Sequence, residues 1–251
     1  MSTLTTWICG CLLLSLRIGP VLALAPPFTL VKFPMLFRVL LGTGLAATIV
    51  SFHPTALDGV SAQPGFLVVA AARELMVSLI FVLAFQLAFG AIYLAGRTID
   101  VQAGFGLALL IDPTSGSRTP FVGTIYALVA GILFFAMNGH YDLLRVIAAS
   151  LDSIPLGSPH FTESLGPLLA FMSAIFVVGM GVAGGVILCL FLTDLAIAML
   201  SRTIPQMNVL VLGFQVKTLV LLIALPMTMG FAAALMARML RMTLEALPGL
   251  L

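Results

Sequence analysis

Charged residues are scarce in this sequence. Only 8% of its 251 residues are Asp, Glu, Lys or Arg, whereas a soluble domain has roughly 25%. The 11 basic residues include only two lysines and form no run that could follow a phosphate backbone. This composition excludes a soluble enzyme, a disordered regulator and a nucleic-acid-binding protein.

Cysteine and histidine are also few. The three cysteines are Cys9, Cys11 and Cys189, a number and spacing that fit neither a disulfide framework nor a zinc site, so we interpret them as small apolar residues. The three histidines lie in separate Pro- or Gly-rich connections. The sequence has no HExxH motif, no Cys/His cluster and no G-x-x-x-x-G-K-[ST] loop. We therefore expect no metal, no cofactor and no catalysis.

Long apolar runs are what the sequence has instead. Apolar residues make up 61% of the chain, and the mean hydropathy is +1.23. Six charge-poor windows are bounded by Pro, Gly or charge, and a membrane-spanning helix needs about 20 such residues. The sequence predicts an all-α, polytopic membrane-type protein of one domain with about six long helices. The windows cover residues 4–25, 35–52, 66–96, 120–137, 164–200 and 209–237.

The distribution of Lys and Arg does not orient these six windows in a bilayer. Alternate connections collect five basic residues on one side and four on the other. Membrane proteins normally show a clear excess on the cytoplasmic side. Either the windows are not the true spans, or the protein does not lie as a simple bundle in lipid.

An apolar segment between the third and fourth windows, residues 101–118, is too short to span a bilayer. Its core, Val101–Ile111, has 11 residues and lies between Asp100 and Asp112. Irregular backbone at membrane depth occurs only where protein or a water-filled cavity satisfies it. The segment is therefore interpreted as a re-entrant or protein-buried loop, and the alternative is a short connecting helix.

Two basic residues lie inside apolar windows. Arg17 is near the middle of the first window and Lys217 is near the start of the sixth. Each could bind an anion or line a pore, or it could pair with a neighbour or extend its charge to the interface. Arg73 and Glu74 are adjacent in sequence, so on a helix they point about 100° apart and we expect each to have another partner.

Small residues recur at helical spacing in two places. Faces of this kind allow helices to approach closely where lipid supplies no hydrophobic drive. We expect helix–helix contacts there, within the chain or with partner subunits. The residues are Ala84, Ala88, Ala91 and Ala95 in the third window, and the G-x-x-x-G pair Gly181 and Gly185 in the fifth.

Several motifs occur in a characteristic order along the chain. They are Arg73-Glu74-Leu75, Asp100-Val101-Gln102-Ala103-Gly104-Phe105-Gly106, Asn138-Gly139-His140, and Asp194 followed by Pro205-Gln206 and Lys217. This order resembles the flagellar biosynthesis protein R (FliR) family over almost the whole chain.

The resemblance implies a structural channel subunit of the flagellar type III protein export gate, without enzymatic activity. Such a subunit would assemble with the P and Q subunits, and also with the B and A subunits, into a pore for unfolded flagellar proteins. Its helices would form kinked hairpins. It would belong to the bacterial inner membrane and the flagellar basal body, raised above the bilayer plane once assembled.

The resemblance also implies a plug in the closed channel, at the segment Gly104–Ile111. Gly104 and Gly106 would act as hinges. The seal residues would be Phe105, Leu107, Leu109, Leu110 and Ile111.

Two other functions remain open from the sequence. One is the homologous gate subunit of a virulence type III secretion system, which shares the same pattern. The other is a small secondary transporter, because Arg17, Lys217 and the broken apolar segment are features with which transporters build sites. An intramembrane enzyme would need a nucleophile–base or metal constellation, and the sequence has none.

Overall fold

The fold is built from helices throughout the part of the chain that the structure describes. The computed structural model describes residues 2–30, 34–57, 59–105, 120–158, 166–203 and 209–251, and these form helices and turns without a strand. Five of the described helices are long and apolar enough to cross a membrane, and α6 with α7 make a sixth if they are counted as one broken span. The predicted all-α, polytopic class is confirmed.

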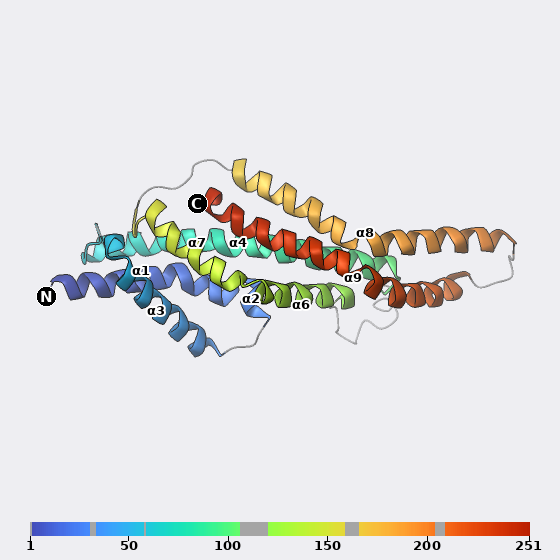
Figure 1. The fold of residues 1–251 in the computed structure, drawn as a ribbon, viewed down its shortest axis with the longest axis horizontal. Helices are drawn as coiled ribbons and strands as arrows, with labels where there is room; N and C mark the ends of the chain where they lie inside the picture. The colour runs from blue at the N-terminus through green and yellow to red at the C-terminus, as the bar shows by residue number, and fades with distance from the viewer. Residues whose placement is uncertain (1, 31–33, 58, 106–119, 159–165, 204–208) are drawn as a thin grey trace. The chain divides into compact units, whose positions relative to one another are not determined.

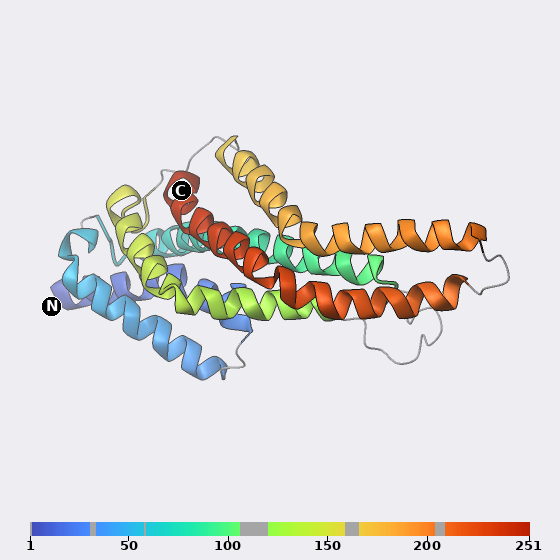
Figure 2. The same ribbon diagram turned by 45° about the vertical axis from the view of Figure 1, so that its right-hand side comes forward.

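Figures 1 and 2 show the helices coloured in chain order, from blue at the N-terminus to red at the C-terminus. In chain order they are α1 (Ser2–Leu24), α2 (Pro26–Thr29), α3 (Met35–Phe52), the 3₁₀ turn η1 (Pro54–Leu57), α4 (Pro64–Gln102), α6 (Phe121–Ala136), α7 (Gly139–Ser153), α8 (Gly166–Thr203) and α9 (Val209–Leu250).

The predicted windows and the observed helices differ mainly at their ends. Window 35–52 coincides with α3, but α4 continues from residue 96 to Gln102, and α9 continues from residue 237 to Leu250. A charged residue ends an apolar window without ending a helix, because Arg, Lys and Glu are good helix formers. Helix α7 was not predicted, since it is amphipathic and only one of its faces is buried.

The chain forms two compact units. Unit 1 contains Met1–Leu87, Phe134–Ser173 and Leu240–Leu251, and unit 2 contains Ala88–Leu133 and Ala174–Met239. Helices α4, α6, α8 and α9 each contribute residues to both units.

Unit 1 is organised around α1, which packs against α3 and buries Leu14 and Ile18. A Cβ atom built on Gly42 of α3 would lie 3.8 Å from the Gly19 Cα of α1, which is ordinary van der Waals contact between the two helices. Phe28, Phe85 and Phe134 form edge-to-face ring contacts with centroids 5.6–6.1 Å apart. Aromatic pairs of this geometry add to the stability that burial alone provides.

In unit 2, α4 and α6 pack closely through a pair of glycines. A Cβ atom built on Gly96 of α4 would lie only 2.5 Å from the Gly123 Cα of α6 and 2.6 Å from its nitrogen. Both neighbouring atoms belong to backbone and cannot rotate away. The two helices therefore pack at this distance only because both residues are glycine.

The predicted small-residue faces lie at helix contacts. Ala88 and Ala95 of α4 are fully buried in unit 2, and a Cβ atom on Gly179 of α8 would lie 2.9 Å from the Ala91 Cβ. Ala84, on the unit 1 part of α4, is also buried.

On α8, the predicted G-x-x-x-G pair faces α9. A Cβ atom on Gly181 would lie 3.4 Å from Leu235, and one on Gly185 would lie 2.9 Å from Thr228. These residues make contacts within the chain.

We predict that Gly96→Ala destabilises unit 2. Overpacking against backbone costs about 1–3 kcal/mol, which exceeds the roughly 1 kcal/mol that alanine gains over glycine in a helix interior. Gly90→Ala on the same helix is the matched control, because nothing lies within 4 Å of a Cβ atom there. Thermal unfolding of the purified chain in detergent should show a lower Tm for Gly96→Ala only. Equal midpoints for both variants would contradict the close contact.

Candidate functional site

A buried ion pair joins α1 to α4 inside unit 1. Arg17 is 0% exposed and Glu74 is 1% exposed. The Arg17 Nε donates to Glu74 Oε2 over 2.6 Å, and its Nη2 donates to Glu74 Oε1 over 3.1 Å. This is the two-pronged geometry in which guanidinium and carboxylate form their strongest hydrogen bonds.

The remaining polar atoms of this ion pair are satisfied by α7 and the turn that follows it. Arg17 Nη1 donates to Ser150 Oγ over 2.8 Å, and Nη2 also donates to the Ile154 carbonyl over 3.0 Å. The Gly157 N–H donates to Glu74 Oε1 over 3.0 Å. Since a buried charge is costly unless it is paired and hydrogen-bonded, α1, α4 and α7 must all be in place to form this cluster.

Arg73 and Glu74 have separate partners in unit 1. The Arg73 Nη1 donates to the Gly157 carbonyl over 2.8 Å, while Glu74 accepts from the Gly157 N–H. Gly157 has φ +74°, and a Cβ atom there would lie 2.9 Å from the Phe66 ring, so the turn requires glycine. Arg73 and Glu74 thus bind the carbonyl and the N–H group, respectively, of the same residue, Gly157.

The second basic residue, Lys217, belongs to a polar cluster in unit 2. Its Nζ lies 2.6 Å from Asp194 Oδ1, and the Gln102 Nε2 donates to Asp194 Oδ2 over 3.0 Å. Lys217 also donates to the Gln102 carbonyl over 3.3 Å. The cluster links α4, α8 and α9, and its ion pair is partly exposed, with 21% of the Lys217 side chain and 37% of the Asp194 side chain accessible.

Helix α4 ends beside this cluster in a Schellman motif. The Phe105 N–H donates to the Asp100 carbonyl over 3.0 Å, and the Gly104 N–H donates to the Val101 carbonyl over 3.1 Å. Gly104 has φ +89°, the left-handed conformation that this motif places after a helix and that glycine adopts without strain. Phe105 then packs edge-to-face on Phe214 of α9, with ring centroids 6.3 Å apart.

The structure therefore places two of the predicted plug residues at a helix end. Gly104 terminates α4, and Phe105 contacts α9. The other residues of the predicted plug, namely Gly106, Leu107, Leu109, Leu110 and Ile111, lie outside the described residues.

Asp100 has a role that its sequence position did not reveal. Its carboxylate accepts from the Val122 N–H over 3.1 Å and from the Gly123 N–H over 3.3 Å. Backbone N–H groups in the first turn of a helix have no partner within that helix, so a side chain near the end of α4 caps the start of α6. In the sequence, Asp100 marks only one edge of the apolar segment.

The polar residues that sequence analysis missed as partners are Ser150 and Asp194. Each lies far along the chain from the residue it contacts, because 133 residues separate Ser150 from Arg17, and 92 separate Asp194 from Gln102. Sequence spacing gives no signal for such contacts. Asp194 stood out only as part of a family motif.

Both clusters direct their charges toward other groups of the same chain. Arg17 and Glu74 are closed to solvent, and Lys217 and Asp194 neutralise each other. No group of three or more His, Cys, Asp or Glu residues that could hold a metal ion occurs in the described ranges. The arrangement fixes helices in register and ends α4 at a defined residue.

We predict that Arg17→Met destabilises unit 1 by about 3–5 kcal/mol, because it leaves the Glu74 carboxylate buried without a counter-charge. Adding Glu74→Gln should recover part of this loss, since glutamine is neutral and still accepts from the Gly157 N–H. Chemical denaturation of the detergent-solubilised chain measures both effects.

The matched control is Arg145→Met on α7. Arg145 is 82% exposed at the side chain and lies 3.9 Å from Asp142, so its loss should change the free energy of unfolding by less than about 1 kcal/mol. An equal loss for Arg17→Met and Arg145→Met would contradict the assigned role of the buried pair.

Comparison with known proteins identifies the family. The chain matches the family described as "Bacterial export proteins, family 1" over residues 8–243. The flagellar biosynthetic protein FliR of Bacillus subtilis is 31% identical over 183 residues, which cover 71% of each chain. The protein of the same name from Escherichia coli is 26% identical over 226 residues, 90% of this chain and 82% of that one.

A relative with a different name also matches. The surface presentation of antigens protein SpaR of Shigella flexneri is 27% identical over 147 residues, 59% of this chain and 57% of that one. The family match covers nearly the whole chain, and FliR relatives align along most of its length. The chain therefore belongs to the bacterial export protein family 1, the family that the sequence motifs indicated through their resemblance to FliR.

Proposed function

We propose that this protein is a structural channel subunit of the flagellar type III protein export gate. The observation that carries the proposal is the family match over residues 8–243, together with flagellar relatives that cover most of the chain. In this function the chain forms part of a conduit wall, and it assembles with the P and Q subunits and with the B and A subunits. Its place is the bacterial inner membrane, at the flagellar basal body.

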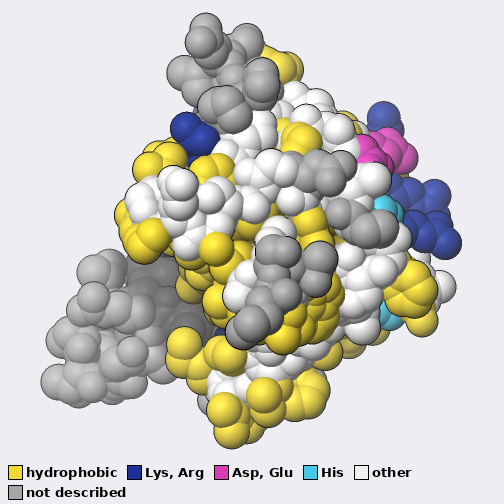
Figure 3. All heavy atoms as spheres, turned by 90° about the vertical axis from the view of Figure 1, so that its left-hand side faces the viewer, with side chains coloured by type: hydrophobic (Ala, Val, Ile, Leu, Met, Phe, Trp, Pro, Cys, Tyr) yellow, Lys and Arg dark blue, Asp and Glu magenta, His cyan; other side chains and the backbone are white. Residues whose placement is uncertain are grey.

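The surface of the chain supports such an assembly. On α3, Met35, Leu36 and Leu40 are 76%, 71% and 61% exposed. Hydrophobic side chains are spread widely over the face shown in Figure 3, and charged ones gather in few places. Exposed apolar area of this extent marks contacts with protein or lipid.

The polar clusters support a passive role for the subunit. The buried pair of Arg17 and Glu74 and the pair of Lys217 and Asp194 are engaged within the chain. In the proposed function the chain provides wall and seal, while unfolded flagellar proteins pass and other components supply the energy.

The proposed seal begins at the end of α4. Gly104 and Phe105 are its first residues. The side chains that would block the passage of solutes are those of Phe105, Leu107, Leu109, Leu110 and Ile111. Gly104 and Gly106 would be the hinges. What supports this assignment is the Schellman end of α4 and the packing of Phe105 on Phe214, which give the segment a fixed starting point.

We predict that the tagged chain, solubilised in mild detergent, co-purifies with two other small hydrophobic proteins, the P and Q subunits.

A strain that lacks the gene should lose filaments and swarming, and a plasmid that carries the wild-type gene should restore both. Full motility of the deletion strain, or recovery of a folded chain without either subunit, would refute the proposal.

The match to SpaR favours a second candidate, the corresponding subunit of a virulence type III secretion system. The same deletion strain separates the two functions. Loss of motility with normal secretion of virulence proteins supports the flagellar gate, and the reverse result supports the virulence gate.

We predict that deleting Phe105–Ile111 makes cells permeable to small solutes, because the apolar seal is removed. Replacing the same seven residues with a Gly/Ser segment of equal length should have the same effect, since it keeps the chain length but not the apolar side chains. Uptake of a small dye reports permeability, and co-purification of the gate subunits reports assembly. Unchanged permeability in an assembled gate would remove the seal assignment.

A further inference from the structure

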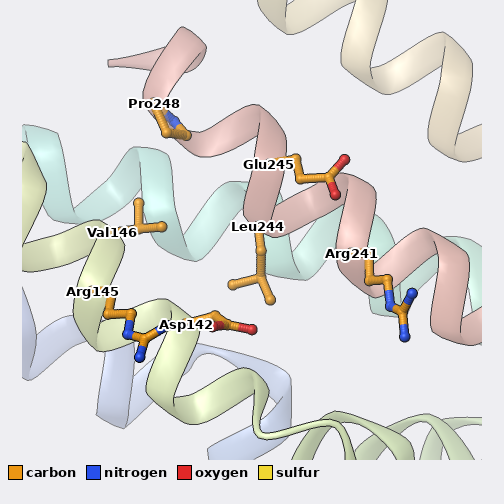
Figure 4. Close-up of a pocket in the computed structure, with 7 residues that line it drawn as sticks. All are labelled: Asp142, Arg145, Val146, Arg241, Leu244, Glu245 and Pro248. Carbon is orange, nitrogen blue, oxygen red and sulfur yellow. Dashed lines mark ion pairs between the residues drawn. The ribbon is translucent and has the colours of Figure 1, made fainter.

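A pocket of unit 1 lies between α7 and the end of α9 (Figure 4). Its volume is about 350 Å³, and four charged side chains line it, namely Asp142 and Arg145 from α7 and Arg241 and Glu245 from α9. In Figure 4 these side chains do not converge on a common point. They therefore offer a ligand no shared set of polar contacts.

The end of α4 in unit 2 is held differently on its two sides. On the side of α6 the contacts are buried. The Asp100 carboxylate accepts from the Val122 and Gly123 N–H groups, and Asp100 is only 5% exposed. One turn earlier, Gly96 lies against the backbone of Gly123. Separation on this side would leave a buried carboxylate and two buried N–H groups without partners, which is costly.

On the side of α8 and α9, the same helix end is held by side chains that water reaches. The Lys217 Nζ lies 2.6 Å from Asp194 Oδ1 and donates to the Gln102 carbonyl over 3.3 Å. Phe214 lies three residues before Lys217, so the two share a face of α9, and the Phe214 ring meets that of Phe105. The ion pair and the ring contact therefore form one small interface between α9 and the end of α4.

The two sides differ in the cost of separation. Opening the pair of Lys217 and Asp194 returns two partly exposed charges to water, and pairs of this kind contribute little stability. The ring contact is also open to solvent, since Phe214 is 40% exposed. The end of α4 therefore separates more readily from α8 and α9 than from α6.

We propose that Lys217 and Asp194 are positioning residues of the seal. Their ion pair, together with Gln102, holds Phe105 on Phe214 in the closed channel. When the pair opens, Phe105 moves off α9 while α4 stays on α6. The proposal rests on the proposed channel function, from which Phe105 takes its role as a seal residue. It adds which charges hold that residue and on which side it is released.

Amide hydrogen exchange of the full-length chain in detergent measures this positioning. The Gly104 and Phe105 N–H groups close the last turn of α4, and the Thr124 N–H belongs to the first turn of α6. In Lys217→Met the first two should exchange about two- to fivefold faster, the change expected from loss of a partly exposed ion pair. Thr124 should exchange at the wild-type rate. Unchanged exchange at Gly104 and Phe105, or equal acceleration at all three amides, would overturn the proposal.

Two further variants separate the ion pair from a general effect of substitution. Lys217→Arg keeps the charge and the hydrogen-bond donors, so exchange at Gly104 and Phe105 should stay at the wild-type rate. Arg202→Met is the matched control, because it removes one positive charge from an exposed residue in the last turn of α8, in the same unit but outside the cluster. Acceleration in either variant as large as in Lys217→Met would refute the role of the pair.

Dye uptake by cells that carry the gate tests the consequence for the seal. The wild-type gene is first introduced into the deletion strain, and its failure to restore swarming would refute the channel function and this proposal with it. Where swarming is restored, Lys217→Met should raise dye uptake about two- to fivefold, with the gate subunits still co-purified. Uptake at the wild-type level would overturn the positioning role alone and leave the channel function standing.

Discussion

The buried ion pair of Arg17 and Glu74 is the constraint on which unit 1 depends. Apolar helix faces can slide or rotate against one another at modest cost, because one hydrophobic contact replaces another. A charge in a low-dielectric interior has no such freedom, since every displaced hydrogen bond leaves an unsatisfied group. The pair therefore fixes the register of α1 against α4, and Ser150 and the Ile154 carbonyl fix the end of α7 at the same point.

Unit 2 is held by a different combination of contacts. Gly96 and Gly123 bring the backbones of α4 and α6 together, and the Asp100 carboxylate caps the first turn of α6 at the same crossing. The pair of Lys217 and Asp194 joins α8 and α9 to the last residue of α4. Close packing sets the distance between helices, and the polar contacts set where each helix begins or ends. The end of α4 at Gln102 is thereby fixed by contacts with α6, α8 and α9.

Many large hydrophobic side chains of the described residues remain exposed at the surface. The polar groups of the two clusters are occupied, so in the proposed function contacts with partner subunits would depend largely on shape and on exposed hydrophobic side chains such as those of α3. The pocket between α7 and α9 is different, because its four charged side chains lie at the surface and have weak partners or none among the described side chains.

Composition and periodicity alone determined the class of this protein. Uninterrupted apolar runs of about 20 residues in a chain with 8% charge are typical of membrane-type helices, which satisfy their backbone hydrogen bonds internally, so the all-α membrane type was predicted directly. The same reasoning located α3 at its observed bounds. It also identified Arg17 and Lys217 as basic residues inside apolar windows, where a charge needs a partner or access to water. It missed α7, which is amphipathic, and it ended α9 too early because charge was taken as a helix boundary.

Only the tertiary structure decided which groups meet. Glu74 is 57 residues from Arg17, and Asp194 is distant from Gln102, so no local pattern could pair them. The spacing of small residues indicated helix contacts, but the partner of each face depends on how the whole chain folds. Local sequence encodes which faces must be buried. The partner of a buried charge is selected by the three-dimensional path of the chain, because electrostatic and hydrogen-bonding contacts act over a few ångströms of space regardless of distance along the sequence.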